Sequence, residues 1–253
     1  MERAALGAWV SASAYRWYRR QNIRRRDEVD VLIRWLDPRP GETILDIGCG
    51  DGMYTYEVAR SDASIVGIDI DEQRLAVARR WHGSPNIQYH RMNADRLELG
   101  DEVFDKVVSF CVIEHLERGQ EVLRQVHRVL KPQGLLVFSA DSLSGPEITE
   151  EERHSHRHKY QVQRYYDPEY LRALLADTGF RLGAIRYLLT APTTLHLIQW
   201  SWWLDQLSQP WHWFSYSGYL ILGVLGPCVI RLAEAVSARH DCGLTLIALA
   251  RKE

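Results

Sequence analysis

The sequence lacks the features that define several common classes of protein. Its 253 residues include only four cysteines, and these do not have the paired spacing of a zinc site or of a disulfide framework. The formal net charge is −2, so no excess of positive charge points to nucleic acid as a partner. No uninterrupted apolar segment follows the arginines near the N-terminus, and we therefore expect no secretory signal peptide. These absences favour an intracellular globular protein in a reducing compartment, with free thiols at Cys49, Cys111, Cys228 and Cys242.

The most informative segment that is present is a glycine-rich turn. Residues 43–52 read T-I-L-D-I-G-C-G-D-G, an apolar run that ends at Asp46 and is followed by glycines at alternate positions. This order predicts a buried strand and then a tight turn in which the backbone passes close to a ligand. Residues 53–60 predict a helix whose N-terminal amides face the same ligand. A nucleoside-containing cofactor is therefore expected at the turn that contains Gly48, Gly50 and Gly52.

Four more apolar runs follow the turn, and helical patterns lie between them. The first of the four ends at Asp69, where a doubly wound fold places the acid that binds ribose hydroxyls. The next leads to N-A-D, in which the carboxylate of Asp95 can accept a hydrogen bond from an adenine amino group. The alternation predicts a parallel sheet with helices on both faces. The four runs span residues 64–68, 87–91, 104–110 and 135–140.

Together these ordered signals resemble the class I S-adenosylmethionine-dependent methyltransferases, over roughly residues 40–190 and the last strand. The resemblance implies that the glycine turn wraps the methionine part of the cofactor, that Asp46 contacts its amino group and that Asp69 binds both ribose hydroxyls. For each carboxylate the alternative is a turn residue or a helix cap. The implied cofactor-binding residues are Asp46, Gly48, Cys49, Gly50, Gly52, Asp69, Ile70, Asn93, Ala94, Asp95, Phe110 and Cys111.

The expected fold is a doubly wound, Rossmann-like α/β sheet of about seven strands with an antiparallel last strand. Residues 1–40 carry helical patterning and form N-terminal helices, a cap or a membrane-surface element. Residues 41–190 together with 242–253 form the core, in which 180–190 and 244–250 pair as antiparallel strands at the sheet edge. Between those two strands lies a helical insertion, residues 191–241, which is far longer than a hairpin loop.

The insertion is rich in tryptophan, and its residues 216–230 contain no charged side chain. This run is too short and too interrupted by glycine and proline for a confident membrane span, and it favours an interfacial helix. Arginines and aromatic residues interleave over residues 9–26, a pattern that suits an anionic lipid surface. Peripheral association with the inner face of the cytoplasmic membrane is therefore expected. The alternatives are that the insertion packs on the sheet edge, forms a homodimer interface or roofs a pocket for an apolar substrate.

The reaction that the resemblance implies is displacement at the sulfonium methyl carbon, for which an oxygen acceptor needs a base. His115 is a candidate because it follows the fourth strand at the ligand-binding edge of the sheet; alternatively, Glu114 and His115 only begin a helix. The segment E-H-L also resembles ubiquinone-pathway O-methyltransferases, in which an acid three residues before the E-H pair is associated with a divalent metal. This chain has Cys111 there, so no metal is expected.

A second histidine group, H-S-H-R-H-K-Y, spans residues 154–160. In an extended segment its alternating histidines share a face, where they either touch substrate, with His154 as a candidate base, or bind a metal. Asp141, after the fifth strand, is a third candidate base. The stretch after the fourth strand, S-F-C-V-I-E-H-L, has neither the N/D-P-P-Y tetrad nor the Pro-Cys pair of nucleobase methylation. The sequence thus predicts methyl transfer to a small hydrophobic or lipid-like acceptor, favouring oxygen over carbon. The alternatives are a soluble natural-product methyltransferase, a non-catalytic regulatory protein and a membrane adaptor.

Overall fold

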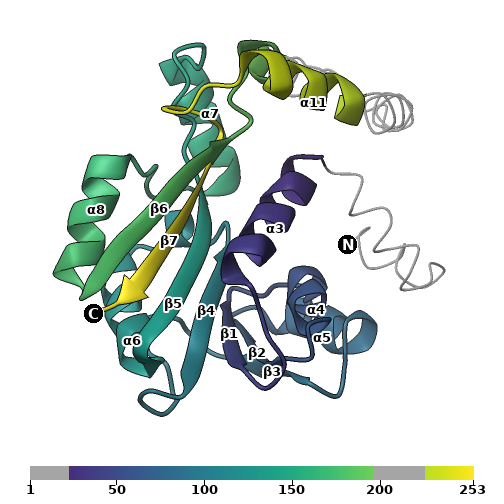
Figure 1. Cartoon of the computed structure of the whole chain (residues 1–253), viewed down its shortest axis with the longest axis vertical. Helices are drawn as coiled ribbons and strands as arrows, with labels where there is room; N and C mark the ends of the chain where they lie inside the picture. Colours follow the sequence, from purple (N-terminus) through teal and green to yellow (C-terminus); the bar gives the residue numbers. More distant parts are fainter. Residues whose placement is uncertain (1–22, 197–225) are drawn as a thin grey trace.

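In the computed structural model, which describes residues 23–196 and 226–253, one mixed sheet of seven strands runs through the molecule (Figure 1). The strand order is β3-β2-β1-β4-β5-β7-β6, and β7 alone runs antiparallel, to β5 on one side and to β6 on the other. The predicted Rossmann-like sheet with an antiparallel last strand is confirmed. Its strands are β1 (Thr43–Ile47), β2 (Ser64–Asp69), β3 (Ile87–Arg91), β4 (Phe104–Phe110), β5 (Leu130–Asp141), β6 (Phe180–Leu188) and β7 (Thr245–Lys252).

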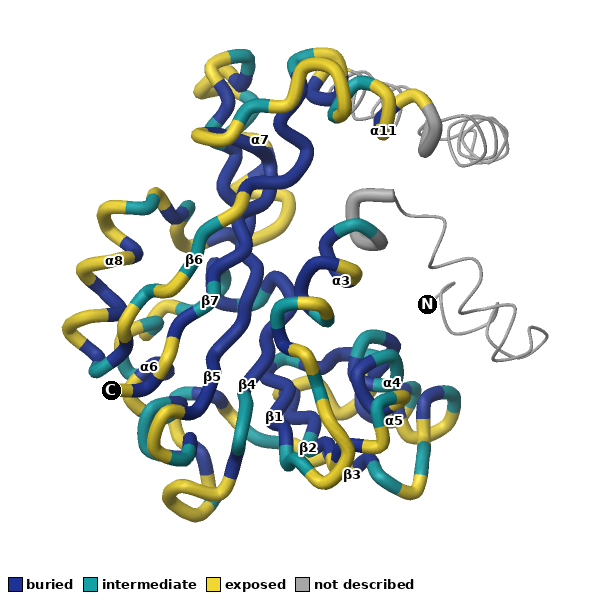
Figure 2. Tube along the Cα trace, viewed as in Figure 1, coloured by how far each residue is buried: buried dark blue, intermediate teal, exposed yellow. Residues whose placement is uncertain are grey.

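Helices cover both faces of the sheet because successive strand residues point to opposite sides. Ile44 faces one hydrophobic core, which takes in α3, α4 and α5, and Leu45 faces the other, which takes in α6 and α8. Figure 2 shows the central strands buried between these layers. The described helices are α3 (Ile23–Leu36), α4 (Met53–Ala59), α5 (Glu72–Trp81), the 3-10 turn η1 (Ile113–His115), α6 (Gly119–Val129), α7 (Glu150–Tyr160), α8 (Pro168–Asp177) and α11 (Gly226–Ser237).

Side-chain caps fix where several helices begin. Asp71 accepts hydrogen bonds from the backbone N–H groups of Gln73 and Arg74 at the start of α5. Asp167 caps α8 in the same way, and Pro168 occupies the first turn, where its missing N–H is not needed. The start of each helix is therefore fixed by an aspartate at its N-cap.

Two expectations about secondary structure are wrong. The fifth strand begins at Leu130 rather than Leu135, because Leu130 already pairs with Phe104 and a register shift absorbs the K-P-Q-G segment within the strand. The histidines at 154–160 lie on a helix rather than in an extended segment. Thr149 and Glu152 form a reciprocal capping box there, and this arrangement starts α7.

Several sequence expectations fall outside the described residues. Of the N-terminal helices expected within residues 1–40, only α3 is described. Of the insertion 191–241, only residues 191–196 and 226–241 are described. The tryptophans of the insertion lie in the undescribed part. Within the described ranges, no helix combines the length and the apolar character needed to cross a membrane.

Candidate active site

The glycine turn after β1 has a backbone shape that only glycine adopts without strain. Gly48, Gly50 and Gly52 have φ angles of 72°, 56° and 77°. A Cβ built on Gly48 would lie 2.4 Å from Val112 Cγ2, and one built on Gly52 would lie 2.4 Å from the Tyr89 hydroxyl. The turn is therefore a close-packed cradle at the carboxyl edge of the sheet, as a cofactor-binding turn requires.

Asp46 lies beside this turn and is fully buried, with 1% of its surface exposed. The Thr55 hydroxyl donates a hydrogen bond to its Oδ2 at 2.6 Å, whereas Oδ1 has no partner among the described residues. Burial raises the pKa of Asp46 to about 7; the bond from Thr55 opposes this shift, and the nearby charge of Asp69 adds to it. An ammonium group would satisfy the second oxygen and return Asp46 to its charged form.

Asp69 ends β2 and contacts the turn directly. Its carboxylate accepts hydrogen bonds from the backbone N–H groups of Gly50, at 2.8 Å, and Asp71, at 2.9 Å. Asp69 thus orders the glycine turn, and each oxygen keeps a lone pair for a second donor such as a ribose hydroxyl. The neighbouring Ile70 is 65% exposed, so an apolar side chain is available there for the face of a base.

The remaining expected cofactor residues lie at the same edge of the sheet. After β3, Asn93 Oδ1 accepts a hydrogen bond from the backbone N–H of Asp95 at 3.3 Å, Ala94 is buried, and the Asp95 side chain is partly exposed. At the end of β4 the buried Phe110 ring packs 5.1 Å from the ring of Tyr54. Cys49, within the glycine turn, is buried, and burial raises the pKa of its thiol far above the ordinary value. Its role there is packing rather than nucleophilic chemistry.

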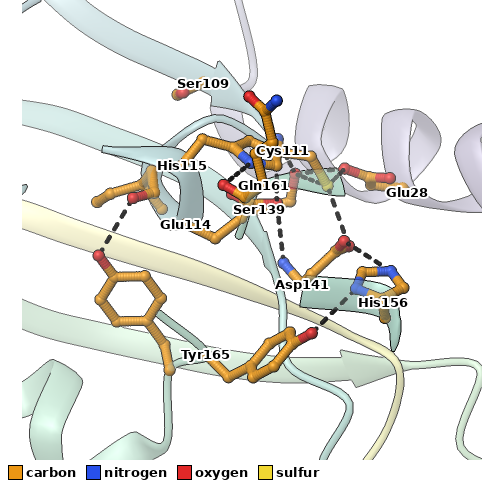
Figure 3. A network of polar contacts seen from close by, with 12 residues as sticks. Glu28, Ser109, Cys111, Glu114, His115, Ser139, Asp141, His156, Gln161 and Tyr165 are labelled. Atoms are coloured by element: carbon orange, nitrogen blue, oxygen red, sulfur yellow. Dashed lines mark hydrogen bonds and ion pairs between the residues drawn. The ribbon is translucent and has the colours of Figure 1, made fainter. Parts of the chain in front are cut away.

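A buried polar cluster lies where β4 and β5 end (Figure 3). Cys111 Sγ is 3.0 Å from Glu28 Oε1 and 3.8 Å from Asp141 Oδ1. Glu114 accepts a hydrogen bond from the backbone N–H of Asp141 at 3.1 Å. We use the name buried polar cluster for Glu28, Cys111, Glu114, Ser139, Asp141 and His156, all of which are buried.

His156 joins α7 to this cluster. Its Nε2 lies 3.4 Å from Asp141 Oδ2, and its Nδ1 lies 3.0 Å from the Tyr165 hydroxyl. Of the residues of α7, all of which are described, only His156 is buried. The helix therefore directs His156 toward the core, whereas His154 and His158 are exposed.

The three expected bases differ in burial. Asp141 belongs to the buried polar cluster. His154 is exposed on α7, and His115 is at the surface, with Nδ1 3.4 Å from the Gln161 carbonyl oxygen and Nε2 3.9 Å from Glu114 Oε1. Glu28 is not among the site residues that the sequence predicts, and His156 is not distinguished there from its neighbours. A helix that begins at the Thr149 capping box has a period of 3.6 residues, which places His156 and His154 on different faces.

The sheet order, the glycine turn after β1 and the acid that ends β2 define the fold of the class I S-adenosylmethionine-dependent methyltransferases. Residues 45–138 match the family model described as a methyltransferase domain. The chain therefore contains a methyltransferase domain of this class.

Curated relatives match over part of their length. A protein named "Ubiquinone biosynthesis O-methyltransferase" from Pseudomonas fluorescens is 33% identical over 140 residues, covering 52% of this chain and 60% of the relative. The chain thus spans about three fifths of the length of that relative.

Solved structures show the same fold at low identity. Phosphoethanolamine N-methyltransferase 2 of Haemonchus contortus, in complex with S-adenosyl-L-methionine, aligns with a TM-score of 0.64 at 20% identity, over 89% of this chain and 52% of that one. The [4+2]-cyclase SpnF aligns with a TM-score of 0.63 at 21% identity, over 89% of this chain and 80% of that one. The names of these two structures show that proteins with different activities share this fold.

Proposed function

We propose that the chain transfers a methyl group from S-adenosylmethionine to an oxygen of a small hydrophobic or lipid-like acceptor. The observation that carries the proposal is the buried Asp46 oxygen beside the glycine turn, which has no partner among the described residues. Asp46 would hold the cofactor's ammonium group, Asp69 its ribose hydroxyls, and Ile70 and Asp95 its adenine. A close-packed glycine cradle and an uncompensated buried carboxylate fit a cofactor that carries a positive charge.

When bound, the cofactor supplies an activated methyl group on a sulfonium leaving group. Held by Asp46 and Asp69, the cofactor would supply this methyl group to the acceptor oxygen, and the electron pair of the broken C–S bond would stay on sulfur. The chain's part is to align the two reactants, exclude water and receive the acceptor's proton. The buried polar cluster lies at the ligand-binding edge of the sheet, and Asp141 is the expected base that belongs to it.

Similarity to the ubiquinone biosynthesis O-methyltransferase supports an oxygen acceptor on a lipid-like molecule. Two alternatives remain distinct from this proposal. In one, the chain is a soluble methyltransferase in which the insertion roofs the substrate or forms a dimer interface. In the other, it binds the cofactor without transferring the methyl group, as a regulatory protein.

A membrane-surface location is the second part of the proposal, and α11 supports it. Glu234 anchors the helix by accepting hydrogen bonds from the Thr190 hydroxyl, at 2.8 Å, and from the backbone N–H groups of Thr190 and Ala191, both at 2.9 Å. Figure 2 shows much of α11 exposed. Three apolar side chains spaced along one side of the helix are exposed: Val229 by 49%, Leu232 by 66% and Val236 by 78%.

The function is tested by incubating the full chain with S-adenosylmethionine labelled in its methyl group and with lipid and polar extracts of the source cell. The expected result is label in a compound of the lipid fraction, formed in step with S-adenosylhomocysteine. Label confined to the polar fraction would contradict the lipid-like acceptor. Cofactor binding without label in any fraction would favour the regulatory alternative.

A further inference from the structure

Arg74 places a positive charge on the glycine turn, beside the residues that would hold the cofactor. It lies in the first turn of α5, the helix that follows Asp69. A Cβ built on Gly50 would lie 2.3 Å from Arg74 Nη2 and 2.7 Å from Arg74 Cζ, so the guanidinium rests on the backbone of Gly50. In doubly wound folds the second glycine of such a turn is the one over which the cofactor approaches the backbone. Arg74 therefore covers the part of the turn that a cofactor would meet.

The Arg74 guanidinium has no acidic partner in the part of the chain that the structure describes. Its side chain is exposed, and no ion pair or side-chain hydrogen bond joins it to another residue of the ranges 23–196 and 226–253. The charge nevertheless acts inside the turn: burial raises the pKa of the Cys49 thiol, and the positive charge of Arg74 opposes that rise. The turn thus has a guanidinium at its surface in addition to the carboxylates beneath it.

The sulfonium group of the cofactor belongs at the ribose end of the turn. In S-adenosylmethionine the sulfur is bonded to the methylene group of the ribose, and a longer carbon chain separates it from the amino group. Under the proposed function Asp69 holds the ribose and Asp46 holds the ammonium group. Gly50 donates its backbone N–H to Asp69 Oδ2 at 2.8 Å, so Gly50 lies at the ribose end. The sulfonium would therefore lie near the part of the turn that Arg74 covers.

Cofactor and product differ in charge at the sulfur atom alone. It is a cationic sulfonium in S-adenosylmethionine and a neutral thioether in S-adenosylhomocysteine. The remaining groups are common to both molecules, so their contacts with Asp46 and Asp69 largely cancel when the two affinities are compared. A guanidinium beside the sulfur repels only the sulfonium. Two positive charges roughly 8 Å apart change the ratio of affinities by about 2–30-fold, for effective dielectric constants from about 80 to about 20.

We propose that Arg74 is a specificity-determining residue that weakens binding of the cationic cofactor relative to its neutral product. The inference rests on the proposed function, because it requires S-adenosylmethionine to occupy the glycine turn. The repulsion disappears when the methyl group leaves, because the sulfur is then neutral, so Arg74 favours transfer as well as retention of the product. Turnover then depends on a reaction that consumes S-adenosylhomocysteine.

The test measures the dissociation constants of both molecules for the full chain by calorimetric titration. In R74Q the ratio of the S-adenosylmethionine constant to the S-adenosylhomocysteine constant should fall by about 2–30-fold. R74K keeps the positive charge and should keep the wild-type ratio. In about 1 M salt the Debye length is about 3 Å, so the wild-type ratio should approach that of R74Q.

Two controls separate charge at the sulfur from other effects of substitution. R80Q removes another exposed arginine of α5, whose guanidinium lies 5.0 Å from the centroid of the Trp81 ring, and it should leave the ratio unchanged. An analogue with a protonated amine in place of the methylated sulfonium should gain affinity relative to S-adenosylhomocysteine in R74Q, as the cofactor does. That gain would exclude the methyl group itself as the cause. Circular dichroism checks that the variants are folded.

A ratio that is the same in R74Q and in the wild type, or that falls equally in R80Q, would overturn the inference. Either result, with both molecules still bound by the wild type, would leave the proposed function standing. Failure of the folded wild type to bind either molecule would contradict the proposed function, and the inference with it.

Discussion

Replacing Asp46 by asparagine tests whether this carboxylate is the partner of a positively charged cofactor. The folded-state pKa of Asp46, about 7, lies above the ordinary value of 3.8, and the difference corresponds to about 4 kcal/mol. Because the folded-state pKa is raised, the contribution of Asp46 to the free energy of unfolding is fully present below pH 3.8, where the carboxyl is protonated in both states. It is lost as the pH rises to 7, because the unfolded chain ionises first. At pH 8 the wild type therefore buries an uncompensated charge, which D46N removes.

We expect cofactor-free D46N to be more stable than the wild type at pH 8 by about 1–3 kcal/mol. That range is the roughly 4 kcal/mol above, reduced by the cost of a buried amide group without a partner. Chemical denaturation at pH 8 and pH 5 measures the difference, which should shrink at the lower pH. Equal stability of the two proteins at pH 8 would refute the reasoning about burial.

Cofactor affinity should change in the opposite direction. An ammonium ligand favours the ionised carboxylate, whose fraction falls from about nine tenths at pH 8 to about one tenth at pH 6 for a pKa of about 7. The ratio of wild-type to D46N affinity should therefore fall about tenfold between these pH values. Comparison with D46N cancels the titration of the cofactor's own amino group. A ratio that does not change with pH would show that Asp46 is not the ammonium partner.

Two further substitutions test the turn and the exposed helix. G52A should lower the free energy of unfolding by about 1–3 kcal/mol and weaken cofactor binding, because φ is 77° and the new Cβ would meet the Tyr89 hydroxyl. Unchanged stability and affinity would contradict this. The double variant L232D/V236D should weaken flotation with anionic liposomes by roughly 100-fold, as expected if at least about 3 kcal/mol of apolar burial is lost, while S237D should not. Equal flotation of wild type and double variant, at unchanged stability, would exclude α11 as the membrane contact.

The cofactor end of the site was largely predictable because its residues follow from local order along the chain. An apolar run that ends in an acid and glycines predicts a strand and a turn, and Asp69 lies at the next strand end for the same reason. Each of these inferences needs only a few neighbouring residues. The sheet order then places the strand ends at one edge.

The acceptor end was less predictable because distant segments meet there. Glu28 and Cys111, which are in contact, are 83 positions apart, and no local pattern links them. The three histidines alternate along the sequence, and a period of two residues predicts a strand in which His156 shares a face with His154 and His158. On α7 the relevant period is 3.6, which turns His156 inward and His154 outward.

The most direct test of the central claim is calorimetric titration of the full chain with S-adenosylmethionine and, separately, with S-adenosylhomocysteine. Both molecules should bind at one site per chain. D69N should weaken both, because Asp69 orders the glycine turn through Gly50 and would hold the ribose. Absence of binding by either molecule to the folded chain would contradict the account.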